Sequence, residues 1–205
     1  SFFEYMDRDL QTQTIFQSVM TGPNAWNDAI VTAYDFSQAR ALIDVGGGRG
    51  ALALAVLSDQ PEANAVVLDR AQVIGAVGAD LRATQPRCRW QPGDFFDAVP
   101  GTFDHCLLRL ILHDWSDEDA VTILRNCRDA LAADGRVLVI ENLLADEGVT
   151  GVDLLDVSMM VLTGGRERAQ GEYSRLFERS GLSLTGVLPT AAGLSILVAE
   201  AAVDP

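Results

Sequence analysis

Two histidines are the side chains of this sequence whose ordinary pKa lies closest to neutrality. His105 falls inside the apolar stretch 103–108, which predicts a buried strand, so packing is its simplest interpretation. His113 follows Leu110-Ile111-Leu112, just past the end of that strand. Ligands of open α/β sheets bind at the carboxyl ends of the strands. His113 is therefore the candidate general base, although its position alone is equally compatible with a structural role.

A glycine-rich turn, Asp44-Val45-Gly46-Gly47-Gly48-Arg49-Gly50, separates an apolar strand at 41–45 from an Ala- and Leu-rich helix at 50–58. Glycines there let the backbone turn tightly and let a ligand approach the amides at a helix N-terminus. With Ala51, the same residues satisfy the dinucleotide fingerprint G-x-G-x-x-A. The turn by itself therefore fits more than one class of nucleotide cofactor, and it also fits a tight turn without a ligand.

Three carboxylates near this turn favour S-adenosylmethionine over a dinucleotide. Asp44 lies two residues before the first glycine, where it can organise a cationic amino-acid group. Asp69 ends the next predicted strand and can accept both ribose hydroxyls, a feature that fits either cofactor. Asp94, within Gly93-Asp94-Phe95-Phe96, offers a carboxylate for the adenine amino group, and Phe95 offers a ring for its face. Taken together, they predict an S-adenosylmethionine site.

The elements that position these residues alternate between strand and helix, which predicts an α/β fold with a mostly parallel sheet covered on both faces. Residues 1–35 have helical spacing, and the tail at 182–188 and 194–200 predicts an antiparallel strand pair. Further strands are predicted at 65–68, 88–90, 103–108 and 136–140, and further helices at 71–83, 117–132 and 170–180.

Composition excludes several classes of function. The net charge of −14 argues against a grip on nucleic acid or an anionic membrane, both of which need clustered cations. No apolar run reaches the roughly 18 residues of a membrane helix. The cysteines are odd in number and lack metal-ligand spacing, which favours reduced thiols in a cytoplasmic protein, and no metal site is expected.

Three stretches carry a resemblance that goes beyond these patterns. They are Leu112-His113-Asp114-Trp115-Ser116-Asp117-Glu118, followed by Ile123-Leu124-Arg125-Asn126-Cys127, and Gly164-Gly165-Arg166-Glu167-Arg168. In this order they resemble the small-molecule O-methyltransferase family, which includes plant phenylpropanoid and flavonoid enzymes and bacterial polyketide-tailoring enzymes. The resemblance covers about residues 1–200 and implies the Rossmann-like class I methyltransferase fold with a seven-stranded sheet.

The resemblance implies a role for each matching position. His113 would take the proton of a hydroxyl on an aromatic or polyketide-type acceptor, flanked by Glu141 and Glu167. Arg109 stands where a lysine is more usual, which keeps the charge but changes the donor geometry. The implied cofactor contacts are Asp44, Gly46, Gly48, Asp69, Asp94, Phe95 and Arg109, and the implied acceptor-pocket residues are Met159, Met160, Met20 and Trp26.

The family also implies a domain arrangement. Residues 1–35 would lead in from an N-terminal dimerisation domain, 36–205 would form the catalytic domain, and the longer protein would be a homodimer serving secondary metabolism such as antibiotic biosynthesis. Three alternatives stay open. The site could be repurposed for hydroxylation, decarboxylation or cyclisation, the chain could be an NAD-dependent oxidoreductase, or it could be a non-catalytic remnant that binds the cofactor.

Overall fold

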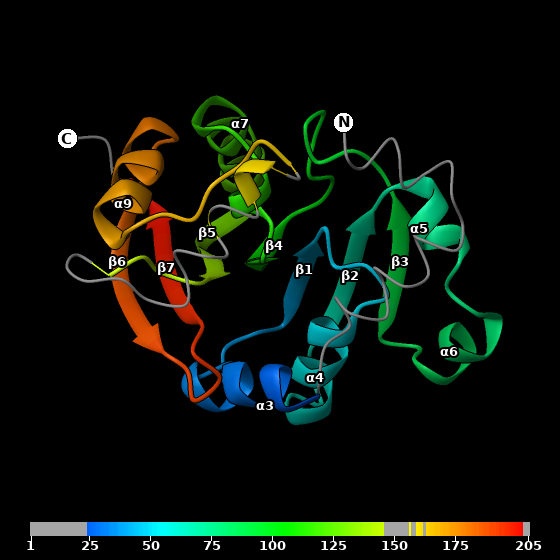
Figure 1. The fold of residues 1–205 in the computed structure, drawn as a ribbon. Coiled ribbons are helices and arrows are strands. Elements are labelled where there is room, and N and C mark those ends of the chain that lie inside the picture. The colour runs from blue at the N-terminus through cyan, green and yellow to red at the C-terminus, as the bar shows by residue number, and fades with distance from the viewer. Residues whose placement is uncertain (1–23, 146–155, 157–158, 162, 203–205) are drawn as a thin grey trace.

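A seven-stranded sheet forms the centre of the computed structural model, which describes residues 24–145, 156, 159–161 and 163–202 (Figure 1). The strand order is β3-β2-β1-β4-β5-β7-β6, and all neighbours are parallel except where β7 pairs with β5 and β6. The predicted mostly parallel sheet with an antiparallel C-terminal pair is confirmed. The strands are β1 (Ala41–Val45), β2 (Asn64–Asp69), β3 (Cys88–Pro92), β4 (Phe103–Arg109), β5 (Leu131–Glu141), β6 (Leu182–Pro189) and β7 (Ser195–Ala201).

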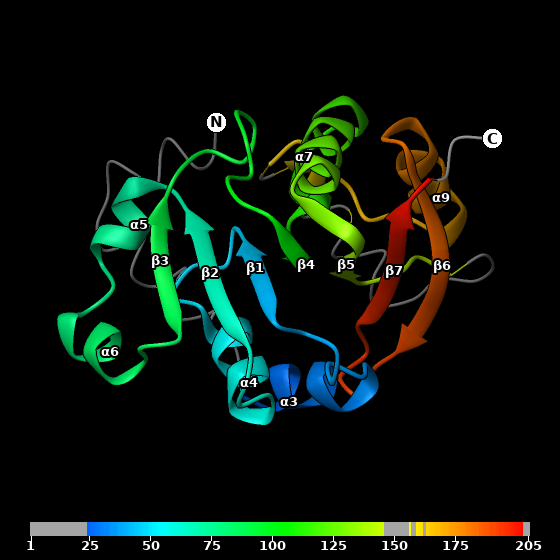
Figure 2. The same cartoon turned by 180° about the vertical axis from the view of Figure 1, so that it is seen from behind.

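Helices cover both faces of this sheet (Figures 1 and 2). The prediction of one helix over 71–83 was wrong, because the chain forms two short helices separated near Gly75 and Gly78, residues that weaken a helix interior. The predicted helix 117–132 ends early, at Asp129, because Leu131 pairs with Phe103 and begins β5. The helices are α3 (Asn24–Ala33), α4 (Ala51–Asp59), α5 (Ala71–Gly75), α6 (Ala79–Thr84), the 3-10 turn η1 (Leu112–Asp114), α7 (Asp117–Asp129) and α9 (Gln170–Arg179).

Successive residues of the inner strands enter two different apolar clusters. Leu42 and Leu107 join the cluster that contains side chains of α3 and α4. Their neighbours Ile43 and Leu108 join the cluster that contains side chains of α7 and α9. This alternation is the period of two expected of a strand buried on both faces. The sheet is therefore covered on both faces, and the loops that follow its strands lie at its carboxyl edge.

His105 lies near the amino end of β4 and has a structural role, as its position in the sequence indicated. It is 3% exposed, and the Tyr34 hydroxyl lies 3.0 Å from its Nε2. Its Nδ1 lies 2.7 Å from Oδ1 of Asp104, whose other oxygen accepts hydrogen bonds from the backbone N–H groups of Arg40 and Ala41. These hydrogen bonds hold the segment that follows α3 against the amino ends of β1 and β4.

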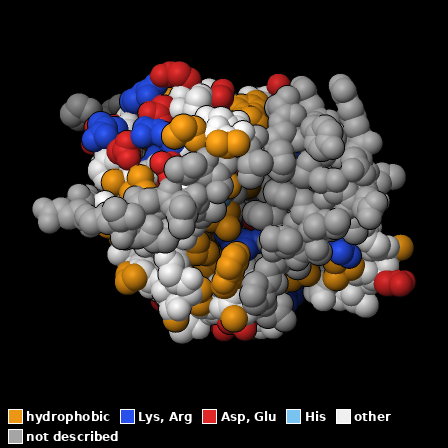
Figure 3. All heavy atoms as spheres, in the orientation of Figure 1, with side chains coloured by type: hydrophobic (Ala, Val, Ile, Leu, Met, Phe, Trp, Pro, Cys, Tyr) orange, Lys and Arg blue, Asp and Glu red, His pale blue; other side chains and the backbone are white. Residues whose placement is uncertain are grey.

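Charged side chains gather over α7 and α9, where acidic and basic groups alternate (Figure 3). Ion pairs in this region join Arg166 to Glu172 and Arg179 to Glu118. Within the described ranges no helix is both long and apolar enough to cross a membrane. The three cysteines are buried free thiols, as predicted.

Candidate active site

The loop between β4 and α7 has an unusual backbone at its start. Leu110 has a φ of +54°, in the left-handed region that non-glycine residues avoid. Its N–H donates to the Ile140 carbonyl at 3.0 Å, and its side chain is buried. Oε1 of Glu141 accepts the next two backbone N–H groups, from Ile111 at 3.1 Å and Leu112 at 2.9 Å. The end of β5 therefore fixes the shape of the loop that carries His113.

His113 lies in η1 with only 7% of its side chain exposed. Its Nδ1 is 2.8 Å from Oε1 of Glu167 and 3.8 Å from Oε2 of Glu141. A carboxylate can only accept a hydrogen bond, so Nδ1 carries the hydrogen and Nε2 of the neutral ring is left to take a proton. The structure thus brings together the three residues that the resemblance grouped.

The ionisable groups of this cluster shift one another. Burial lowers the pKa of His113, but the Glu141 carboxylate and the hydrogen bond to Glu167 outweigh it and, with Asp114, raise the pKa to about 9. Burial raises the pKa of Glu141 to about 7, with the His113 charge opposing. Burial likewise raises the pKa of Asp114 to about 6. His113 is therefore a stronger base than a free imidazole, and its ionisation is coupled to that of the neighbouring carboxyl groups.

Two buried carboxylate oxygens of the cluster, Oε2 of Glu141 and Oε2 of Glu167, have no hydrogen-bond partner among the residues that the structure describes. Ligand atoms of these two residues and of His113 lie within 4.8 Å of one another, close enough to share a metal ion. Nδ1 of His113 is, however, already engaged by Glu167, which is the arrangement of an imidazole oriented for proton transfer.

The glycine turn after β1 has no room for side chains. A Cβ on Gly46 would lie 2.5 Å from Cδ1 of Ile111, and one on Gly47 would overlap the carboxylate of Asp44. Gly46 also has a φ of +69°, which favours glycine. The turn leads directly into the N-terminus of α4, the position at which helices bind anionic ligand groups.

The predicted cofactor residues lie around this turn. Asp69, at the end of β2, accepts the Gly48 N–H at 2.8 Å, and the Phe95 ring lies against the space above Gly46. Asp44 is buried, accepts the Ala53 N–H at 3.3 Å, and has its pKa raised to about 6 by that burial. Exposed Asp94 caps its own turn by accepting the Phe96 N–H at 2.8 Å.

Arg109 connects the two halves of the site electrostatically. Burial lowers the pKa of its guanidinium, while the carboxylates of Asp44 and Glu141 oppose this shift. It therefore lies within range of one acidic residue beside the glycine turn and one beside His113. This position supports the prediction that a basic residue four positions before the histidine belongs to the site.

Of the predicted acceptor-pocket residues, those that the structure describes are not brought together beside His113 as Glu141 and Glu167 are. Met159 is partly buried and Met160 is 60% exposed. Trp26, in α3, packs against the apolar cluster on the α4 face, which is a packing role. Met20 lies outside the described residues. The acceptor pocket therefore stays a prediction.

Sequence reasoning gave no role to Asp114 or Arg168, which also surround His113. Asp114 places Oδ1 3.9 Å from Nε2 of His113, and Arg168 is fully buried beneath the same loop. Both lie inside stretches that carried the family resemblance. Their charge within those stretches was the signal from which a role in the site could have been predicted.

The family model described as an O-methyltransferase domain matches residues 1–183 of the chain. The chain belongs to this family. The domain is 41% identical over 98% of its length to the phenazine O-methyltransferase PhzM of Lysobacter antibioticus. It is 38% identical over 94% of its length to a mitomycin biosynthesis 6-O-methyltransferase of Streptomyces lavendulae. The chain spans 60% and 56% of the lengths of these two relatives.

Solved structures agree with the fold of this O-methyltransferase domain. The crystal structure of LaPhzM superposes with a TM-score of 0.93 at 40% identity, covering 98% of this chain and 62% of that one. An O-methyltransferase from neocarzinostatin biosynthesis superposes with a TM-score of 0.87 at 31% identity, covering 98% and 61%. That structure contains S-adenosyl-L-homocysteine and 1,4-dihydroxy-2-naphthoic acid.

Proposed function

We propose that this O-methyltransferase domain transfers a methyl group from S-adenosylmethionine to a hydroxyl of an aromatic or polyketide-type small molecule, with His113 as the general base. The observation that carries this proposal is the buried imidazole at the carboxyl edge of the sheet, oriented through Nδ1 by Glu167. The names of its relatives, which act on phenazine and mitomycin compounds, support this acceptor class.

The residues around the glycine turn suit the proposed cofactor. When bound, S-adenosylmethionine supplies a methyl group on a positively charged sulfur, which an oxygen nucleophile can displace. The backbone of Gly46 and Gly48 would hold the amino-acid end, Asp69 would bind the ribose, and Phe95 would lie against the adenine. The Asp69 carboxylate accepts the Gly48 N–H at 2.8 Å and the Arg70 N–H at 2.7 Å, which fixes it at the end of β2 beside the glycine turn.

The task of His113 is to remove the hydroxyl proton of the acceptor through Nε2. A phenol has an ordinary pKa of about 10, so it is mostly protonated at neutral pH. The imidazole pKa of about 9 is close to that value, so the neutral form of the ring can take the proton at Nε2 at little cost, and the fraction of this neutral form grows as the pH rises toward 9. Glu141 and Glu167 stabilise the resulting imidazolium, and burial keeps competing water away from it.

Two measurements test this function. Calorimetric titration of the chain with S-adenosylmethionine and with NAD should show binding of the first alone. Incubation with S-adenosylmethionine and a panel of hydroxylated phenazines and naphthoic acids should add one methyl group per acceptor, detected by mass spectrometry. Binding of NAD instead would favour the oxidoreductase, and binding of S-adenosylmethionine with a chemically altered but unmethylated acceptor would favour a repurposed site.

A further inference from the structure

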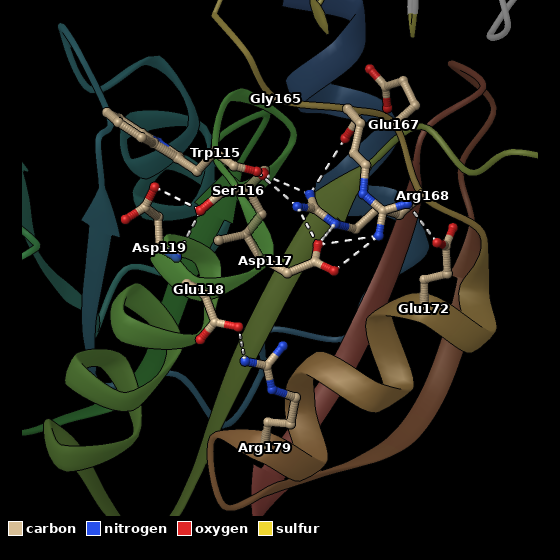
Figure 4. Close-up of polar contacts among 12 residues, drawn as sticks. Trp115, Ser116, Asp117, Glu118, Asp119, Gly165, Glu167, Arg168, Glu172 and Arg179 are labelled. Carbon is tan, nitrogen blue, oxygen red and sulfur yellow. Dashed lines mark hydrogen bonds and ion pairs between the residues drawn. The ribbon is translucent and has the colours of Figure 1, made fainter.

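Arg168 is a fully buried guanidinium whose donors are matched to acceptors of the His113 loop. Nη1 donates to the Leu112 carbonyl at 2.8 Å, and Nη2 donates to the Trp115 carbonyl at 2.7 Å. Nε and Nη2 also bind Oδ1 of Asp117, at 3.0 and 2.9 Å (Figure 4). The planar fork of arginine suits this pattern, whereas a lysine ammonium could not reach all three groups at once.

These acceptors flank His113 on both sides in the sequence. Leu112 comes directly before it, and its N–H is held by Glu141 while its carbonyl is held by Arg168. Trp115 follows two residues after it. The backbone of His113 itself accepts the Arg166 N–H at 2.8 Å. The loop is therefore held from β5 on one side and from residues 165–168 on the other.

The segment 165–168 also approaches the loop too closely for a side chain at its first position. A Cβ on Gly165 would overlap the carbonyl oxygen of His113 and the backbone of Asp114. Two residues later, Glu167 binds the imidazole, and the next residue is Arg168. One short segment thus sets both the backbone of the His113 loop and the carboxylate that orients its ring.

We propose that Arg168, paired with Asp117, is a positioning residue of the methyl transfer, which holds loop 112–117 so that the His113 ring meets the acceptor hydroxyl in line. This inference rests on the proposed function. Arg168 is fully buried, whereas its partner Asp117 is 39% exposed. An ion pair that takes a charge out of water contributes little net stability compared with apolar residues of the same volume, so stability alone is a weak reason for this buried charge. Reaction rates, by contrast, are sensitive to displacements of about 1 Å.

The test compares two neighbouring acidic residues in the first turn of α7. Asp117→Asn weakens the contacts of this carboxylate with Arg168 and with Arg166. Glu118→Gln is the matched control, because Glu118 is 81% exposed and pairs with Arg179 at the surface, away from the loop (Figure 4). Asp117→Asn should lower kcat on the order of tenfold, with the acceptor KM and the Kd for S-adenosylmethionine within about twofold of the parent, and Glu118→Gln should change none of these.

A second readout needs no acceptor and separates positioning from mere stability. The chain has two histidines, so proton NMR can follow each imidazole during a pH titration. The groups facing His113 are Glu141, Glu167 and Asp114, and a loosened loop would move the ring away from them. The His113 midpoint should then fall toward its ordinary value in Asp117→Asn, while the His105 resonances, from a ring held between Tyr34 and Asp104, should be the same as in the parent at each pH.

Arg168→Lys provides an independent variant that keeps the charge but loses the fork, and it should give the same selective change at His113. The proposal is overturned if both variants lower the melting temperature yet leave the His113 titration and kcat as in the parent. It is also overturned if Glu118→Gln changes them equally. The NMR readout is made on the chain alone. If the parent shows no methyl transfer, the proposed function fails, but the NMR titration still tests whether Arg168 positions the His113 ring.

Discussion

Nδ1 of His113 lies 2.8 Å from Oε1 of Glu167, and this hydrogen bond joins residues 54 positions apart in the sequence. It orients the ring and leaves Nε2 for proton exchange. Because both side chains are buried, the contact is made in a medium where an electrostatic interaction is stronger than in water. The orientation of the proposed base therefore depends on how accurately the distant segment 165–168 is placed.

Replacing the proposed base should separate chemistry from cofactor binding. His113→Ala should lower kcat by roughly 10²- to 10⁴-fold, the usual contribution of a general base, with little change in the affinity for S-adenosylmethionine. His113→Gln, which can still donate to Glu167, controls for the loss of a partner in the buried cluster. Turnover by either variant at the parent rate would refute the assignment of the base.

The pH dependence of the rate should follow the His113 ionisation. The pKa of about 9 lies above neutrality, and the base must be neutral to accept a proton, so kcat/KM should rise with pH up to about 9. The Glu141 carboxylate is the largest contribution that raises this pKa. Glu141→Gln, which keeps an oxygen for the Ile111 and Leu112 N–H groups, should move the rise to lower pH.

The control for this profile is Glu200→Gln, since Glu200 pairs with Arg136 on a partly exposed part of β7. Its profile should superpose on that of the parent. A Glu141→Gln profile that rises at higher pH than the parent would show that the carboxylate does not raise the basicity of His113.

The Asp69 carboxylate should contribute to cofactor binding but not to proton removal. Asp69→Ala should weaken S-adenosylmethionine binding by about 10- to 100-fold, because it removes charge-assisted hydrogen bonds to hydroxyls. Asp59→Ala, at the exposed end of α4, is the control and should bind as the parent does. Calorimetry measures both, and equal affinities would remove Asp69 from the ribose site.

Two glycines six residues apart should respond oppositely to alanine. Gly165→Ala places a methyl group on the His113 backbone, so it should lower both the melting temperature and kcat. Gly171 is an exposed residue in the first turn of α9, where Arg175 Nη1 at 3.9 Å is the neighbour its Cβ would meet, so Gly171→Ala should stabilise the helix by about 0.5–1 kcal/mol. Thermal unfolding of both variants decides this, and a stable, fully active Gly165→Ala would show that the contact is not close in solution.

Local patterns predicted the parts of this fold that local forces determine. The strand 41–45, the glycine turn and the helix that follows were read from apolar runs and glycine chemistry, and β1 and α4 lie there. The register of β5 at Leu131 and the interruption of 71–83 were not predicted, because strand pairing and glycine placement overrode helical spacing there.

Only part of the candidate site could be predicted from the sequence pattern, because local patterns do not encode contacts between distant residues. His113 could be selected from its place after a strand, but Glu141 and Glu167 came only from the family resemblance. Their partners are 29 and 54 residues away, and no periodicity encodes such contacts. The contacts of Arg168 with Leu112, 56 residues earlier, and the left-handed backbone of Leu110 required the folded chain.

The left-handed backbone of Leu110 depends on contacts with a distant part of the chain. A leucine in the left-handed region is unfavourable on its own, so a short peptide with the sequence of this turn would not adopt it. The turn is kept in place by Ile140 and Glu141, about thirty residues further along the chain. The geometry of the His113 loop therefore depends on the pairing of β5 with β4, which brings the Glu141 carboxylate to the backbone N–H groups of Ile111 and Leu112.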